Sequence, residues 1–288
     1  MNNPLVSIVV ITYNSSKYVL ETLESAKAQT YQNIELIVTD DGSTDNTIEI
    51  CQQWIDENKK RFVRTEMITV EKNTGIPANC NRGVKAAKGE WIKLIAGDDV
   101  LLDNNIRTNL KFNREKGSKI TFSKMIYVGE NTNKPSQLDR NQSKFLSTSN
   151  QYRYYLRFPL FINVPTLFYH RTTYDSVGGF YEEIKLLEDQ PFILKVLKHG
   201  IKIHYIDEIT VKYRISENSI SSKAGQKIYN DLLQSFVSFR EEDLKRGNFV
   251  DRIYLLAARL NFHFKRNPKH SIGKKNFDRL FNLLLRIT

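Results

Sequence analysis

The first hundred residues alternate between two kinds of apolar pattern. Short runs rich in Val and Ile are typical of strands that are buried on both faces of a parallel sheet. These runs cover residues 6–12, 34–39, 67–70 and 91–95. Between them, apolar residues recur at helical spacing. The helical segments cover residues 18–29, 44–58 and 76–87. This alternation predicts an α/β fold with a doubly wound, mostly parallel central sheet flanked by helices.

The rest of the chain is less regular. Glu130–Gln151 is rich in Asn, Ser, Gln and Lys, which predicts a surface loop or, alternatively, a lid over a substrate. Strand character returns in Phe158–Tyr169, and Glu188–His199 has a helical pattern. Ile201–Tyr213 predicts one or two strands, and from Gln226 the chain is helical again.

The cysteines and the apolar runs limit where this chain can work. Cys51 and Cys80 are too few for a disulfide framework or a zinc ribbon, so we expect two buried thiols in a reducing compartment. The first residues lack a basic start and a small-residue cleavage site. No apolar run approaches the roughly 20 residues needed to span a bilayer. We therefore expect an intracellular protein that is soluble or bound to a surface.

Positive charge is concentrated at the end of the chain. The formal net charge is +11, and the segment 245–288 holds eleven lysines and arginines against Asp251 and Asp278. Phe and Leu residues are interleaved with these cations at near-helical spacing, which predicts basic amphipathic helices. Such a tail favours an anionic membrane surface as its partner. The alternative is a solvated helical face packed on the main domain. No nucleic-acid module accompanies the charge, so we expect no nucleic-acid partner.

Several common catalytic motifs are missing from the sequence. None of the thirteen glycines forms a G-x-G pair, so the dinucleotide fingerprint is absent. The sequence also lacks a phosphate-binding G-x-x-x-x-G-K-[ST] loop and a G-x-S-x-G nucleophile elbow. The five histidines have no spacing typical of metal ligands.

Polar and acidic residues instead follow three of the predicted strands. Thr12-Tyr13-Asn14, Asp40-Asp41 and Asp98-Asp99 each come directly after an apolar run. Ligands of open α/β sheets bind outside the carboxyl ends of the strands, so these residues should meet at one edge. Adjacent carboxylates repel unless a cation lies between them. A hard divalent ion, Mg²⁺ or Mn²⁺, bound to phosphate oxygens would relieve this repulsion.

These residues belong to a longer series of motifs. The series comprises residues 6–14 (VSIVVITYN), 39–45 (TDDGSTD), 73–75 (NTG), 83–91, 97–99 (GDD), 178–180 (GGF), 188–189 (ED) and 213–214 (YR). In content and order it resembles family 2 glycosyltransferases of the Rossmann-like GT-A fold, over residues 4–221. The resemblance implies a GT-A domain with a nucleotide-binding half at 1–99 and an acceptor-binding half at 100–221. A basic amphipathic helical extension follows at 222–288.

The resemblance also implies roles for single residues. Thr12, Tyr13, Asp40 and Asp41 would bind the uridine of a UDP-sugar, since a carboxylate accepts hydrogen bonds from uracil N–H and ribose hydroxyl groups. The remaining donor-site residues would be Asn81, Asp98 and Arg214. The guanidinium of Arg214 would pair with the leaving diphosphate. Asp98 and Asp99 would hold Mn²⁺ or Mg²⁺.

The catalytic pair implied by the resemblance is Glu188 and Asp189. Asp189 matches the family's catalytic aspartate and would act as general base, with Glu188 as the alternative base or as an orienting neighbour. A plain helix-start pair at a positive helix end is the structural alternative.

Three positions depart from the family pattern. Ala96 replaces the first aspartate of the D-x-D-type motif, so metal ligation would rest on the two aspartates that follow. Cys80 replaces an arginine before Asn81, although Arg82 follows. Ser216 replaces a histidine after Tyr-Arg-x.

The sequence thus predicts an inverting, metal-dependent hexosyl or N-acetylhexosaminyl transferase. The donor would be a UDP-sugar, and the acceptor a saccharide or a lipid-linked oligosaccharide in surface-polysaccharide biosynthesis of the capsule or O-antigen type. The expected location is cytoplasmic, peripheral on the inner face of the cell membrane. A non-catalytic sugar-nucleotide-binding module at a membrane surface is one alternative. A glycoside hydrolase, which also uses two carboxylates, is less favoured because it needs no nucleotide site. A transferase acting on nucleotides themselves would need a glycine-rich basic loop, which the sequence lacks.

Overall fold

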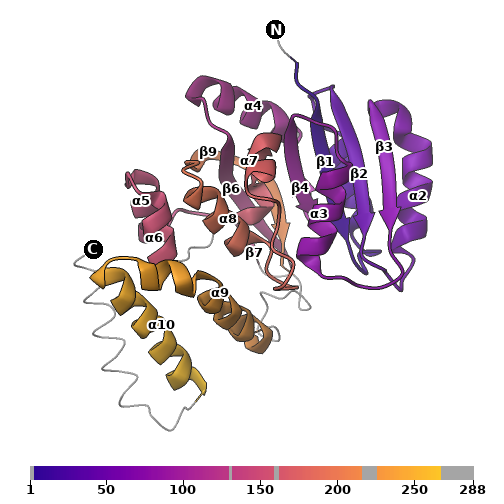
Figure 1. Ribbon diagram of the computed structural model, residues 1–288. Coiled ribbons are helices and arrows are strands. Elements are labelled where there is room, and N and C mark those ends of the chain that lie inside the picture. Colours follow the sequence, from indigo (N-terminus) through magenta and orange to yellow (C-terminus); the bar gives the residue numbers. More distant parts are fainter. Residues whose placement is uncertain (1–2, 130–131, 159–161, 216–225, 267–288) are drawn as a thin grey trace.

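The computed structural model describes residues 3–129, 132–158, 162–215 and 226–266 (Figure 1). Its strands form one nine-stranded sheet in the order β3-β2-β1-β4-β8-β6-β9-β5, with β7 paired to β6. The strands are β1 (Val6–Thr12), β2 (Ile34–Asp40), β3 (Arg64–Thr69), β4 (Trp91–Ala96), β5 (Val100–Leu101), β6 (Ile120–Gly129), β7 (Thr132–Pro135), β8 (Phe168–His170) and β9 (His204–Arg214). The α-helices are α1 (Val19–Lys27), α2 (Thr47–Asn58), α3 (Ile76–Ala86), α4 (Asn105–Lys116), α5 (Arg140–Ser147), α6 (Gln151–Arg157), α7 (Arg171–Ser176), α8 (Asp189–Lys198), α9 (Gln226–Arg246) and α10 (Phe249–Arg266).

The first half of the sheet is parallel, as predicted. β1 lies between β2 and β4 and runs parallel to both, and β3 extends the sheet beyond β2. The register aligns Thr12 with Asp40 and Ile11 with Ala96. The carboxyl ends of β1, β2 and β4 therefore lie side by side. The predicted strands and helices of this half are confirmed, with ends shifted by up to three residues.

Alternate residues of β1 build two cores, one on each face of the sheet. Ile8 and Val10 pack in the cluster that contains residues of α1, α2 and α4. Val9 packs on the other side, with residues of α3 and α8. Gly83 lets α3 approach the sheet closely, since a Cβ there would lie 2.5 Å from Cγ1 of Val9. The buried Cys51 and Cys80, one in each cluster, confirm the expectation of two buried thiols.

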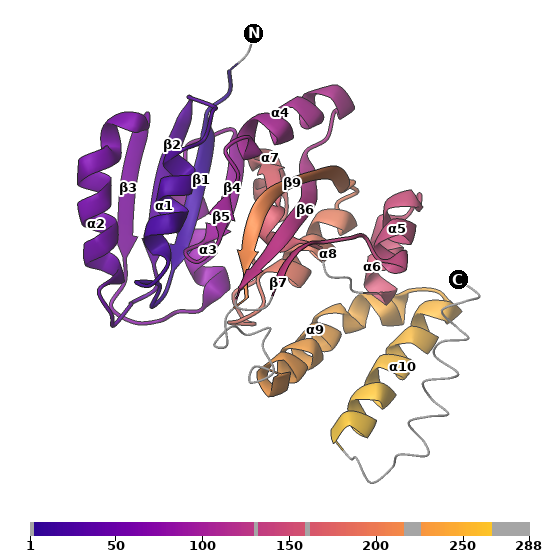
Figure 2. The same ribbon diagram turned by 180° about the vertical axis from the view of Figure 1, so that it is seen from behind.

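The second half of the sheet is mixed. β8 pairs antiparallel with β4 and β6, and β9 runs parallel to β6. Two antiparallel pairings in succession restore the direction of β1, so β9 ends at the same edge as β1 (Figure 2). The prediction of strand over Phe158–Tyr169 was wrong for most of its described residues. Pro165 lacks an amide donor, and Val164–Thr166 forms a 3-10 turn whose Thr166 side chain binds Ser123.

The segment predicted as a loop over Glu130–Gln151 contains regular structure in its described part. β7 pairs with β6, and α5 follows. Asp139 caps α5: its side chain accepts a hydrogen bond from the Gln142 amide, while the Gln142 side chain accepts one from the Asp139 amide. This reciprocal capping box starts a short helix in a sequence too polar to show an apolar pattern.

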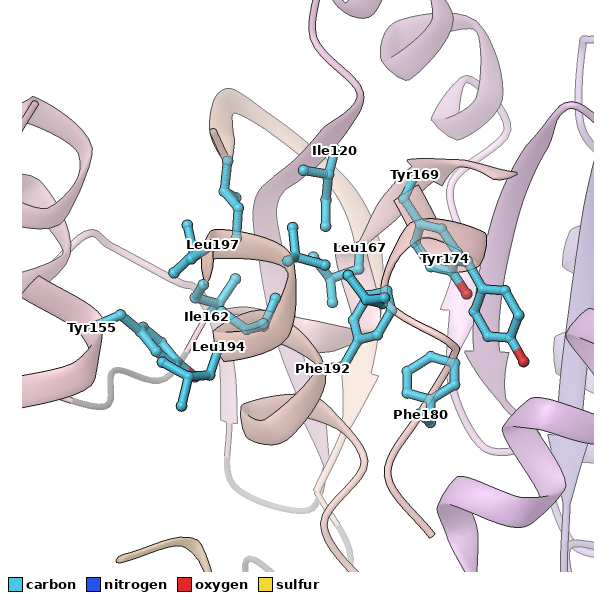
Figure 3. Close-up of a cluster of buried hydrophobic side chains, with 14 of the residues drawn as sticks. Ile120, Tyr155, Ile162, Leu167, Tyr169, Tyr174, Phe180, Phe192, Leu194 and Leu197 are labelled. Atoms are coloured by element: carbon cyan, nitrogen blue, oxygen red, sulfur yellow. The ribbon is translucent and has the colours of Figure 1, made fainter. Parts of the chain in front are cut away.

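The C-terminal helices share the core of the second half. Figure 3 shows α8 at its centre, where Phe192, Leu194 and Leu197 lie among aromatic and aliphatic side chains. Tyr254 and Leu255 of α10 belong to the same cluster. The helices predicted from Gln226 are confirmed to Arg266, while residues 222–225 and 267–288 of the predicted tail lie outside the described residues. Within the described ranges, no helix combines the length and apolarity required to cross a membrane.

Candidate functional site

The register of the parallel strands brings the first predicted site residues together. The Asp41 amide donates to the Thr12 carbonyl (3.0 Å), and the Gly97 amide donates to the Ile11 carbonyl (2.9 Å). Backbone hydrogen bonds thus connect the segments after β2 and β4 to the carboxyl end of β1. In the segment after β1, Tyr13 and Asn14 are exposed, and Tyr13 has 48% of its surface accessible.

Thr12 and Asp40 lie at the base of this edge. The Asp40 carboxylate is fully buried and accepts hydrogen bonds from the Thr12 hydroxyl (2.7 Å), the Ser43 amide (2.7 Å) and the Ser43 hydroxyl (2.6 Å). These bonds hold the turn after β2 against the end of β1. Their direct contact with a donor stays a prediction.

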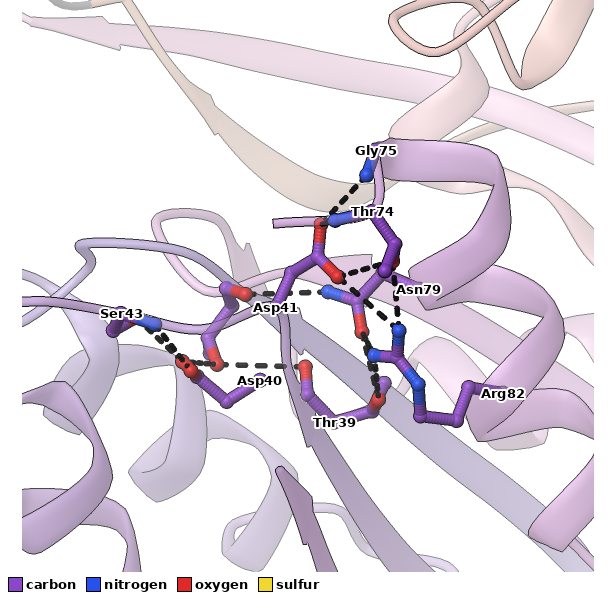
Figure 4. A network of polar contacts seen from close by, with 9 residues as sticks. Thr39, Asp40, Asp41, Ser43, Thr74, Gly75, Asn79 and Arg82 are labelled. Atoms are coloured by element: carbon purple, nitrogen blue, oxygen red, sulfur yellow. Dashed lines mark hydrogen bonds and ion pairs between the residues drawn. The ribbon is translucent and has the colours of Figure 1, made fainter. Parts of the chain in front are cut away.

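Asp41 organises the opposite side of the same turn (Figure 4). Its carboxylate accepts hydrogen bonds from the amides of Thr74 (3.0 Å) and Gly75 (2.8 Å) and from the Thr74 hydroxyl (2.5 Å). The Arg82 guanidinium donates to Asp41 (3.2 Å) and to the Asn79 side chain (2.9 Å). Arg82 therefore brings a positive charge directly to the Asp41 carboxylate.

Asn79 was missed by the sequence argument. Its side chain accepts from the Thr39 hydroxyl (2.7 Å) and donates to the Thr12 carbonyl (3.2 Å), so it joins the ends of β1 and β2 to α3. The available signal was the i, i+3 spacing of Asn79 and Arg82, which places both on one face of a helix.

The loop before α8 is tied to the loop before α3. The Ile76 amide donates to the Lys185 carbonyl (2.8 Å). Gly75 has φ +102°, and a Cβ there would lie 2.8 Å from the same carbonyl oxygen. Only glycine tolerates both the backbone conformation and this approach. The contact brings Glu188 and Asp189 toward the site around Asp41.

The buried thiol of Cys80 lies within electrostatic range of Asp41, Glu188 and Asp189. Burial raises the pKa of its thiol well above the usual range, and the negative charges of Glu188, Asp41 and Asp189 raise it further. Carboxylates from the end of β2 and the start of α8 thus act on one buried atom. The convergence of Asp41 with the predicted catalytic pair follows from the fold.

The pair itself is half-buried at the start of α8. Burial, together with the Asp189 charge, raises the pKa of Glu188 to about 8, and burial raises the pKa of Asp189. The Asp189 carboxylate accepts a hydrogen bond from the Gln190 amide (2.7 Å), whereas the Glu188 side chain makes no cap bond to the helix. The surroundings therefore favour the protonated form of Glu188.

Asp98 and Asp99 differ in their surroundings. Asp99 is 1% exposed, and its carboxylate accepts a hydrogen bond from the Arg214 amide (2.9 Å). Asp98 is half-buried. Burial raises the pKa of Asp98, and burial together with the neighbouring Asp98 charge raises the pKa of Asp99.

The carboxylates of Asp98 and Asp99 supply only part of the oxygen ligands that a divalent cation needs. Of the two carboxylates, that of Asp98 is the more accessible, and the described residues contain no group of three or more His, Cys, Asp or Glu side chains suited to a metal ion. A cation here would need further oxygen ligands from a bound molecule such as a diphosphate.

Arg214 is engaged with the protein. Its guanidinium donates to the Asp98 carbonyl (3.0 Å) and to the Glu21 carboxylate (2.6 Å), and it lies 4.2 Å from the centroid of the Tyr18 ring. These contacts hold the end of β9 beside the turn after β4. The predicted pairing with a diphosphate stays a prediction, and Ser216 lies outside the described residues.

Asn81 points away from the strand ends. Its side chain accepts from the Tyr174 hydroxyl (2.7 Å) and the Phe180 amide (2.8 Å), and donates to the Phe180 carbonyl (2.9 Å) and the Glu182 carboxylate (2.6 Å). These four bonds use its full hydrogen-bonding capacity. Asn81 therefore connects α3 to the turn that leads to α8. None of these four bonds supports its predicted place in the donor site, which stays a prediction.

Replacing Asn81 with alanine should lower the free energy of unfolding by about 1–3 kcal/mol, because buried partners at Tyr174 and Phe180 lose their hydrogen bonds. Urea denaturation measures the change. The matched control is Asn33→Ala, which removes one exposed bond to the Asn3 carbonyl and should have little effect. An equal loss in both variants would contradict the connecting role.

The family described as glycosyl transferase family 2 matches residues 7–176, more than half of the chain. The chain belongs to this family. The resemblance seen in the motifs is thereby confirmed, and the protein is a glycosyltransferase.

Three relatives of this glycosyltransferase illustrate the match. An uncharacterized glycosyltransferase of Haemophilus influenzae is 32% identical over 77% of this chain and 84% of its own length. The Bacillus subtilis protein named putative teichuronic acid biosynthesis glycosyltransferase TuaG is 27% identical over 78% of this chain and 86% of its own length. Glycosyltransferase GlyG of Streptococcus pneumoniae is 39% identical over 41% of this chain, a match that spans 38% of GlyG.

Solved structures share the GT-A fold of this glycosyltransferase. S. aureus TarS 1-349 in complex with UDP-GlcNAc superposes with a TM-score of 0.65 at 22% identity, covering 92% of this chain and 74% of TarS. The mannosyltransferase PcManGT of Pyrobaculum calidifontis, in complex with GDP-Man and Mn²⁺, gives a TM-score of 0.62 at 17% identity, covering 91% and 71%. The predicted fold class is confirmed.

Proposed function

We propose that this glycosyltransferase moves a hexosyl or N-acetylhexosaminyl group from a UDP-sugar to an acceptor hydroxyl with inversion at the anomeric carbon. The observation that carries the proposal is the backbone contact between Ile76 and Lys185, because it ties the loop that binds Asp41 to the loop that leads to Glu188 and Asp189. It supports a single site that combines the predicted nucleotide edge with the predicted base. The UDP-GlcNAc complex of TarS supports this donor class.

In the proposed reaction, Asp189 accepts the proton of the attacking hydroxyl. The acid that keeps its proton at neutral pH is Glu188, with a pKa of about 8, so a single negative charge faces the acceptor. Attack from the side opposite to UDP breaks the anomeric bond and gives the inverted product. A divalent cation held by Asp98, when bound, would offset the charge of the departing diphosphate.

The acceptor we propose is a saccharide of a cell-surface polysaccharide, carried as a lipid-linked oligosaccharide. TuaG, whose name refers to teichuronic acid biosynthesis, supports a polysaccharide product. We assign the donor to residues 1–99 and the acceptor to 100–221, with 222–288 as a helical extension whose described part packs into the acceptor half.

Calorimetric titration with UDP tests the donor site. Asp41→Asn should weaken UDP binding about tenfold or more, because it removes a charged acceptor and releases Arg82. Asp56→Asn, on the outer side of α2, is the matched control and should bind as the parent does.

A panel of UDP-sugars with Mn²⁺, read by UDP release, then identifies the donor. Absence of UDP binding would overturn the proposal, and binding without transfer to any acceptor would favour a non-catalytic module.

A further inference from the structure

α10 carries an exposed apolar strip on the outer end of the molecule. Phe249 is 76% exposed and Leu256 is 58% exposed. They lie seven residues apart, two helical turns, and therefore on the same face. Ile253, one turn from each, is half-buried between them. The opposite side of α10 is covered, since it packs against α9 and α6 (Figures 1 and 2).

Positive charge flanks this strip. Arg252 is exposed on α10. Arg246, just before the helix, has 82% of its side chain accessible and pairs with Glu242 at 3.8 Å. Arg259 is exposed but paired with Glu241. The acid of α10, Asp251, is buried and faces away from the strip, where Arg153 and Arg157 neutralise it.

We propose that this face of α10 lies on an anionic lipid surface. Phe249 and Leu256 enter the headgroup region, while Arg246 and Arg252 contact lipid phosphates. Large apolar side chains rimmed by arginines match such a surface in both chemistry and charge. The proposal goes beyond sugar transfer and does not depend on the identity of the donor. It would place the enzyme where a lipid-linked acceptor is embedded.

The test is flotation of the full-length protein with vesicles of pure phosphatidylcholine and of phosphatidylcholine with phosphatidylglycerol. We expect binding only to the anionic vesicles, weakening as salt is added. The variant Phe249→Ser/Leu256→Ser should reduce the partition coefficient about tenfold or more, because two apolar side chains leave the interface. Arg246→Glu/Arg252→Glu should reduce it by a similar factor.

Matched controls lie on a different part of the surface. Val63→Ser removes an apolar side chain that is 64% exposed, and Lys60→Glu reverses an exposed charge; neither should change binding. Thermal melting of each variant confirms folding. Equal binding by the Phe249/Leu256 variant and the parent would overturn the proposal, as would failure of the parent to float. Two further results would overturn the proposal. One is that the Phe249/Leu256 variant loses self-association rather than vesicle binding, and the other is that residues 267–288 alone account for vesicle binding.

Discussion

Replacing Asp189 with asparagine should slow sugar transfer by about 10²–10⁴-fold, the range supplied by a positioned general base. Asparagine keeps the size of the side chain and its bond to the Gln190 amide, so the fold and UDP affinity should be preserved. UDP release with a saturating acceptor measures the rate, and calorimetry measures UDP binding. Asp207→Asn, an exposed carboxylate on β9, serves as control. Turnover near that of the parent would remove Asp189 from the role of base.

The variant Glu188→Gln distinguishes the role of Glu188 from that of Asp189. Below pH 8 the Glu188 side chain is mostly protonated, so an uncharged glutamine should leave the acid limb of the rate profile unchanged. Its raised pKa means that the folded state binds an extra proton between about pH 4.5, the unfolded value, and pH 8. Stability should therefore fall as pH rises through this window, and the variant should lose that fall. A loss of turnover as large as that expected for Asp189→Asn would instead assign the base to Glu188.

Some of this site could be predicted from sequence because its residues follow strands. The Val- and Ile-rich run of β1 fixes where the strand ends, and the parallel register then aligns Thr12 with Asp40. The approach of Asp189 to Asp41 depends on a backbone contact between Ile76 and Lys185, which no local pattern encodes. Sequence motifs supplied the candidate residues, whereas long-range packing determines which of them lie close together.

The role of Asn81 could not be predicted for a related reason. Its partners Tyr174 and Phe180 lie more than ninety positions away, and an asparagine in the middle of α3 is equally suited to a ligand. The predicted strand over residues 158–169 failed because an apolar run cannot by itself show that Pro165 and Asn163 redirect the chain. Apolar composition predicts burial more firmly than it predicts backbone conformation.

Replacing Asp251 with asparagine should lower the free energy of unfolding by about 3 kcal/mol. The Asp251 side chain is fully buried and binds the guanidinium groups of Arg153 and Arg157, the latter at 2.7 Å. Removing its charge leaves two arginines of α6 without their partner, a change that typically costs 3–5 kcal/mol in buried pairs. The partial exposure of Arg153 places our estimate at the lower end.

Urea denaturation measures this loss, and Glu242→Gln is the matched control. The Glu242 side chain is 66% exposed, so its pairing with Lys245 should be worth no more than about 1 kcal/mol. Because Tyr254 and Leu255 of α10 share one apolar core with α8, Asp251→Asn should shift a single cooperative transition. A separate early transition would show instead that α9 and α10 come off the domain as an independent unit. In that case the face proposed to meet the membrane would belong to a detachable arm, and the enzyme's distance from its acceptor would no longer be set by the fold.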